Sequence, residues 1–175
     1  QIYIPATKNR FRNVITWDVL TRMLNMNAIW SEKSLVMVLD RQVLPAASYC
    51  TMNTDRTGND SLMPDATKVM ALLEKGASLG LNEIDTLTPE IADLVNCFEK
   101  TLTAKGQCNL YSSAAQRQAF RSHYDTHDVY AIHFEGEKTW RVWTNRMNHP
   151  IRHPRFMSTG EQFDMENRGE VMMDS

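Results

Sequence analysis

The chain changes from helical to strand-like patterning near residue 107, and this change restricts its fold more than any other feature. In residues 16–25 and 88–105, apolar side chains recur three and four positions apart behind an N-capping threonine. From residue 107 onward, short runs of aromatic and β-branched residues predominate. Because helices come first and strands follow, the sequence predicts an α+β fold with N-terminal helices packed on antiparallel β-structure.

Capping residues, glycines and apolar runs predict the individual elements. Three helices are expected, in residues 16–25, 64–76 and 88–106. Five short apolar or β-branched runs are predicted to be strands: residues 35–39, 78–81, 108–112, 129–134 and 139–144. Glu135–Lys138 is predicted to form a hairpin turn. The stretch from Cys50 to Pro64 is rich in Thr, Asn, Asp, Gly and Ser, and we expect it to be a mobile loop.

The composition is that of one folded domain. Of 175 residues, 42% are hydrophobic and 23% are charged, which is enough apolar surface for a single core. The formal net charge of −2 lacks the broad positive field that gathers nucleic acid, so the composition does not point to a nucleic-acid partner and does not exclude one. The three cysteines form no CxxC pair, and no apolar run reaches the length of a membrane span. We therefore expect reduced thiols, no membrane segment and a cytoplasmic location.

The densest cluster of side chains suited to metal chemistry lies in residues 123–128. On a strand, residues two apart face the same side, so His123 and Asp125 could present an imidazole and a carboxylate to one metal ion. Such a pair, joined by a second histidine, forms the facial triad that binds Fe(II) and leaves coordination positions open. A solvated strand end is the alternative interpretation. His127 is expected at the rim of the site and His133 in the core.

Three blocks of sequence carry a resemblance to a known family: Asn109–Tyr111, Phe120–Tyr130 and Glu135–Val142. They resemble the JmjC-type cupins of the ribosomal oxygenase group, in which an N-L-Y strand, an H-x-D motif and a G-x-K/R-x-W-R hairpin occur in this order. The segment from Leu72 to Val95 also resembles the helix, strand and helix that precede these blocks. The resemblance covers roughly residues 66–156, and the joint occurrence of the blocks is far more specific than H-x-D alone.

This resemblance implies a double-stranded β-helix, the cupin barrel, that binds Fe(II) and 2-oxoglutarate. His123 and Asp125 match the first two metal ligands. Lys138 matches the basic residue that pairs with the distal carboxylate of 2-oxoglutarate. Asn109 and Tyr111 are two residues apart on a predicted strand, so they share a face and are candidates to hydrogen-bond the cosubstrate. A tyrosine that only fills the barrel is an equal alternative.

The resemblance also suggests how the chain is organised. Residues 1–105 are expected to be a helical and strand region flanking the barrel, and residues 106–175 the first part of the barrel itself. The third metal ligand of the family is a histidine on a later strand, and His149 and His153 come too early for that place. We therefore expect the third ligand beyond Ser175 and a barrel incomplete at its C-terminus. The 175-residue chain alone is then expected to be catalytically inert.

The function implied is that of an Fe(II)- and 2-oxoglutarate-dependent oxygenase that hydroxylates a protein side chain, with ribosomal protein as the first candidate substrate. The same chemistry on a tRNA or a peptide natural product is one alternative. A non-catalytic cupin that acts as a binding or dimerisation module, forming a homodimer, is another. A histidine after a G-D-x-L turn later in the full-length sequence would favour the oxygenase over the module.

Overall fold

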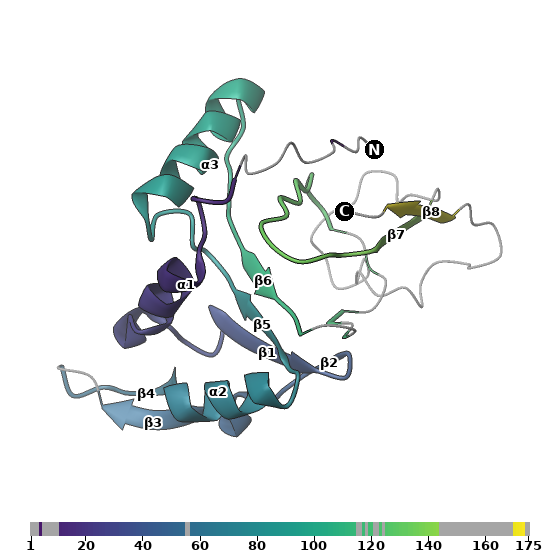
Figure 1. Cartoon of the computed structure of the whole chain (residues 1–175). Helices are drawn as coiled ribbons and strands as arrows, with labels where there is room; N and C mark the ends of the chain where they lie inside the picture. The colour runs from purple at the N-terminus through teal and green to yellow at the C-terminus, as the bar shows by residue number, and fades with distance from the viewer. Residues whose placement is uncertain are drawn as a thin grey trace. The chain divides into compact units, whose positions relative to one another are not determined.

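The computed structural model describes residues 4, 11–54, 57–114, 117, 119–120, 123, 125–143 and 170–173. Contacts divide the chain into two compact units, residues 14–120 and residues 1–13 with 121–175. Within the described residues, the larger unit contains three α-helices, a four-stranded sheet and a two-stranded hairpin, and the smaller unit contains a two-stranded sheet (Figure 1). These contacts divide the chain after residue 120, and the predicted start of the barrel at residue 106 stays a prediction.

The helices of the larger unit are α1 (Trp17–Leu24), α2 (Ala66–Glu74) and α3 (Pro89–Leu102), with short 3-10 helices η1 (Asn27–Ile29) and η2 (Ala46–Ser48). Its strands are β1 (Leu35–Leu39), β2 (Gln42–Val43), β3 (Cys50–Thr54), β4 (Asp60–Pro64), β5 (Ser78–Leu81) and β6 (Leu110–Ser112). The smaller unit contributes β7 (Trp140–Trp143) and β8 (Glu170–Met173). The three predicted helices and the predicted strands around β1, β5, β6 and β7 are therefore confirmed.

Each helix begins at a side chain that accepts a hydrogen bond from the first turn. The Oγ1 atoms of Thr16 and Thr88 accept from backbone N–H groups of α1 and α3, both at 3.3 Å. The cap of α2 is the carboxylate of Asp65, because Pro64 lies in β4 and does not open the helix as expected. Helix α3 ends earlier than predicted, since Thr103 adopts the left-handed conformation with φ 52° and terminates it before Gly106.

The four-stranded sheet has the order β2-β1-β5-β6 with antiparallel neighbours. Alternate residues of β1 and β5, namely Leu35, Met37, Leu79 and Leu81, are at most 1% exposed and belong to the hydrophobic core. Helices α1, α2 and α3 contribute to the same core, for example through Met23, Val69 and Ile91. Because side chains alternate along a strand, Gly80 lies on the opposite face, where it pairs with Tyr111 of β6.

The prediction of a mobile loop from Cys50 to Pro64 is wrong. Strands β3 and β4 form an antiparallel hairpin with five paired positions, from Cys50↔Pro64 to Thr54↔Asp60. The Oγ1 atom of Thr54 also donates to the Asp60 carboxylate at 2.6 Å. The polar composition does not indicate this hairpin, because backbone groups form its ladder. Of the residues in β3 and β4, Cys50 and Leu62 supply the apolar contacts to the core.

In the smaller unit, β7 pairs with β8 in an antiparallel register that sets Trp140 opposite Met173. Residues 129–134 are irregular, so the predicted strand there is wrong, and His133 is exposed rather than in the core. The expected turn at Glu135–Lys138 contains a bend at Gly136, whose φ is 81°. The described residues thus form helices and antiparallel sheets, in agreement with the α+β class, but they do not close a barrel.

Two further features of the sequence can be compared with the structure. Cys50, Cys97 and Cys108 are all unpaired. Across the described ranges, no helix has the length and apolar character needed to cross a membrane.

Candidate metal and cosubstrate site

The predicted metal ligands lie in the smaller unit. His123 forms a single β-bridge and Asp125 lies in irregular backbone, so the regular strand expected to orient them is absent at these positions. Both side chains are exposed and accessible to an ion. Nowhere in the described part of the chain do three side chains of the types His, Cys, Asp or Glu cluster as a metal site would require. His149 and His153 lie outside the described residues.

Lys138 lies two residues before the first residue of β7, and its ammonium group contacts an aromatic ring. Its Nζ atom is 4.6 Å from the ring centroid of Trp140, within the range of a cation–π interaction. Although the residue as a whole is exposed, protein atoms around the ammonium displace water, and this desolvation lowers the pKa of Lys138. The structure therefore places a partly desolvated cation at the position that the sequence assigned to cosubstrate binding.

The other two predicted cosubstrate residues belong to the larger unit. Asn109 immediately precedes β6, and its Oδ1 atom accepts a hydrogen bond from the backbone N–H of Glu83 at 3.1 Å. Glu83 has a positive φ of 60°, and the next residue, Ile84, donates its N–H to the carbonyl of Cys108 at 2.9 Å. Asn109 thus stabilises the turn that follows β5, a structural role that its position in an N-L-Y motif does not indicate.

Two substitutions of Asn109 test whether its hydrogen bond to Glu83, rather than the size of its side chain, stabilises the turn. Asn109→Ala removes the acceptor for the Glu83 N–H and should lower the free energy of unfolding by about 1 kcal/mol. Asn109→Asp keeps an acceptor oxygen and should retain most of the stability. Urea denaturation of both variants measures the difference. Equal losses for Asp and Ala would show that the hydrogen bond to Glu83 contributes nothing.

Tyr111 lies over Gly80 on the face of the sheet away from the core. A Cβ atom added to Gly80 would be 3.3 Å from Cε1 of Tyr111, so the absence of a side chain there allows this close approach. The ring of Phe120 meets Tyr111 edge-on, with centroids 5.6 Å apart. About half of Tyr111 remains exposed, at 49%. Tyr111 is therefore a surface residue of this unit and is not packed into a filled interior.

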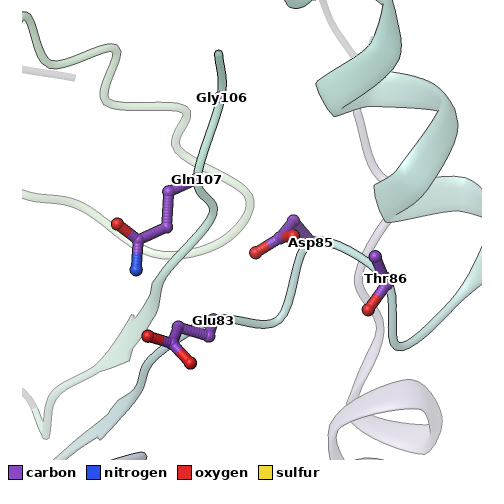
Figure 2. Close-up of a pocket in the computed structure, with 5 residues that line it drawn as sticks. All are labelled: Glu83, Asp85, Thr86, Gly106 and Gln107. Carbon is purple, nitrogen blue, oxygen red and sulfur yellow. The ribbon is translucent and has the colours of Figure 1, made fainter.

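A depression of about 480 Å³, wide open to solvent, lies beside the turn that Asn109 supports. It is lined by Glu83, Asp85, Thr86, Gly106 and Gln107. Figure 2 shows the Asp85 carboxylate extending toward the segment that carries Gln107. The pKa of the neighbouring Cys108 thiol is raised, mainly by burial and further by the negative charge of Asp85. No motif in the sequence predicted this depression, although Glu83 and Asp85, two positions apart, are an acidic pair that could have indicated it.

The donor chemistry of the predicted residues fits the expected groups. An imidazole and a carboxylate are ligands that Fe(II) takes in facial sites, and His123 and Asp125 supply one of each. The Lys138 ammonium suits a carboxylate, and its reduced hydration strengthens such a contact. His123, Asp125 and Lys138 belong to one unit of the chain, whereas Asn109 and Tyr111 belong to the other.

These features, antiparallel sheets flanked by helices together with an H-x-D motif and a downstream lysine, are those of a JmjC-type cupin. A model of the JmjC domain matches residues 81–174, which is more than half of the chain, and the chain belongs to this family. The proteins of the family are Fe(II)- and 2-oxoglutarate-dependent oxygenases. The matched range contains all five predicted site residues.

Two curated relatives are similar along most of the chain. Both are called bifunctional lysine-specific demethylase and histidyl-hydroxylase NO66. The protein from Dictyostelium discoideum is 25% identical over 164 residues, which are 93% of this chain and 29% of the relative. The protein from Culex quinquefasciatus is 23% identical over 136 residues, which are 78% of this chain and 19% of the relative. The chain thus spans less than a third of the length of either relative. No solved structure matches it.

Proposed function

We propose that the chain is part of an Fe(II)- and 2-oxoglutarate-dependent oxygenase that hydroxylates a protein side chain. The observation that carries this proposal is the JmjC match over residues 81–174, because His123, Asp125 and Lys138 stand inside it with the order and spacing of the family motif. Chance occurrence of an H-x-D triplet does not account for a match of this extent.

A protein substrate is supported by the names of the two relatives, which describe action on lysine and on histidine. Lysine and histidine are both side chains of proteins. The slightly acidic net charge of −2 is also better suited to a basic protein surface than to RNA. Within this class we propose ribosomal protein as the first substrate to test, and a cytoplasmic location accordingly.

Each of the proposed site residues has a separate task. His123 and Asp125 would hold the metal through an imidazole nitrogen and a carboxylate oxygen, with a third ligand from outside the described residues. Bound iron supplies the oxidising chemistry that amino acid side chains lack. Lys138 would pair with the distal carboxylate of 2-oxoglutarate and so orient it. For Asn109 and Tyr111, the proposal of a contact with the cosubstrate rests on the N-L-Y motif alone.

Removing the Lys138 ammonium should weaken cosubstrate binding and leave the metal in place. In the full-length protein, Lys138→Ala is expected to raise the Kd of 2-oxoglutarate by about 10- to 100-fold, the loss typical of one charge-assisted contact. The affinity for Mn(II), used as a redox-stable substitute for Fe(II), should stay within about twofold of wild type. Isothermal titration calorimetry gives both values.

A matched control is Lys105→Ala, which removes an equally charged side chain from an exposed position in the other unit. This variant should bind 2-oxoglutarate like the wild type. Unchanged 2-oxoglutarate affinity in Lys138→Ala would contradict the role of Lys138. A full-length protein that binds neither Mn(II) nor 2-oxoglutarate would contradict the oxygenase proposal and favour the non-catalytic module.

A further inference from the structure

The indole ring of Trp140 contacts the Lys138 ammonium. The two residues are separated only by Thr139, and in extended backbone such residues project to the same side. The Lys138 Nζ atom lies 4.6 Å from the Trp140 ring centroid. The backbone of Trp140 is itself held in the β7–β8 ladder, opposite Met173. The ring therefore offers the ammonium a support that is anchored to regular structure.

Contact with the Trp140 ring reduces the number of conformations that the Lys138 side chain adopts. A lysine side chain carries a large rotamer entropy, and fixing it on binding a ligand costs affinity. Tryptophan provides the strongest cation–π contact among the aromatic residues, and such a contact is stronger where water is excluded. Partial desolvation of the ammonium, which lowers the pKa of Lys138, indicates that water is excluded in part.

We propose that Trp140 is a positioning residue that preorganises Lys138 for the distal carboxylate of a dicarboxylate cosubstrate and thereby selects its length. An ammonium group has three N–H donors, so a ring contact such as this one is compatible with a carboxylate contact at the same nitrogen. This inference rests on the proposed function, because it requires a cosubstrate that reaches Lys138 from the metal. A fixed cation suits one chain length, whereas a mobile lysine adapts to a dicarboxylate that is one methylene longer.

The test uses two variants of the full-length protein. Trp140→Phe keeps an aromatic ring that makes a weaker cation–π contact, and Trp140→Leu has no ring. The Kd of 2-oxoglutarate should rise in the order Trp, Phe, Leu, and reach about three- to tenfold above wild type in Trp140→Leu. The ratio of the Kd of 2-oxoadipate to that of 2-oxoglutarate should fall in the same order. Trp17→Leu, which removes a tryptophan that is 61% exposed in the other unit, is the matched control and should change neither value.

A second measurement reports on the geometry without any ligand. The ε-methylene protons of Lys138 should be shifted upfield by the indole ring current in the wild type, less in Trp140→Phe and not in Trp140→Leu. NMR of selectively labelled lysine, assigned with Lys138→Ala, detects this shift. It also shows whether each variant is folded, because the remaining lysine signals should keep their positions.

The possible outcomes distinguish a failure of the role proposed for Trp140 from a failure of the proposed oxygenase function. Wild-type protein that binds 2-oxoglutarate, with Lys138→Ala impaired and both Trp140 variants normal in affinity and length preference, overturns the inference and leaves the proposed function intact. Affinity lost in Trp140→Leu with an unchanged preference for chain length overturns the selection of length. Wild-type protein that binds no 2-oxoglutarate overturns the proposed function and this inference with it.

Discussion

His123→Ala is expected to reduce 2-oxoglutarate turnover in the full-length protein by more than about 100-fold, because it removes a proposed metal ligand. Loss of one ligand leaves the iron with fewer directional bonds and lower selectivity against other metals. Succinate production coupled to a hydroxylated peptide measures the turnover. Metal content after dialysis, measured by elemental analysis, should fall in parallel.

His127 provides the matched control for this experiment. It is an exposed histidine of the same segment, four residues later, and is proposed to lie at the rim of the site. His127→Ala should therefore keep bound metal and a substantial part of the activity. Equal losses in both variants would mean that the metal ligand has been assigned to the wrong histidine.

The largest expected effect on stability is that of Leu81→Ala. Leu81 is 0% exposed and belongs to the core formed by β1, β5 and the helices. Truncating it removes buried apolar surface and leaves a cavity, so the free energy of unfolding should fall by about 2–5 kcal/mol. Denaturant titration followed by circular dichroism measures this loss, or shows that the variant does not fold.

Leu102→Ala is the same substitution at a position that is 45% exposed, at the last residue of α3. It leaves no cavity, and the free energy of unfolding should change by less than about 1 kcal/mol. A loss for Leu102→Ala as large as that for Leu81→Ala would contradict the assignment of the core to the face of the sheet that carries Leu81.

Elements stabilised by local interactions could be predicted from the chain alone. The cap at Thr16 acts on a backbone group three residues away, so the beginning of α1 is readable without a tertiary partner. The apolar run of β1 is equally local, because burial on both faces of a strand requires continuous hydrophobic residues. Residues 129–134 have the composition of a strand but are irregular in the structure, because composition alone does not supply the neighbouring strand whose backbone groups complete a ladder.

The candidate site also combines features that the sequence predicts with features that depend on tertiary contacts. The order of the sequence blocks along the chain was sufficient to predict a JmjC-type cupin, because their joint occurrence is more specific than the H-x-D motif alone, and the family match confirmed the prediction. Their individual roles as ligands and cosubstrate contacts stay predictions. That Asn109 would support the turn at Glu83 could not be predicted, since the two residues are 26 positions apart in the chain.

By itself the sequence determined the family, through the order of its motifs along the chain, and the helix caps at Thr16 and Thr88, because each cap depends on neighbours within a few positions. Only the tertiary structure decided that the polar stretch from Cys50 to Pro64 pairs as a hairpin and that Tyr111 lies over Gly80. It also decided that the Lys138 ammonium rests on the ring of Trp140. The physical reason is that pairing partners, close approaches and rotamers are selected by the packing of the folded chain, and no short segment encodes them alone.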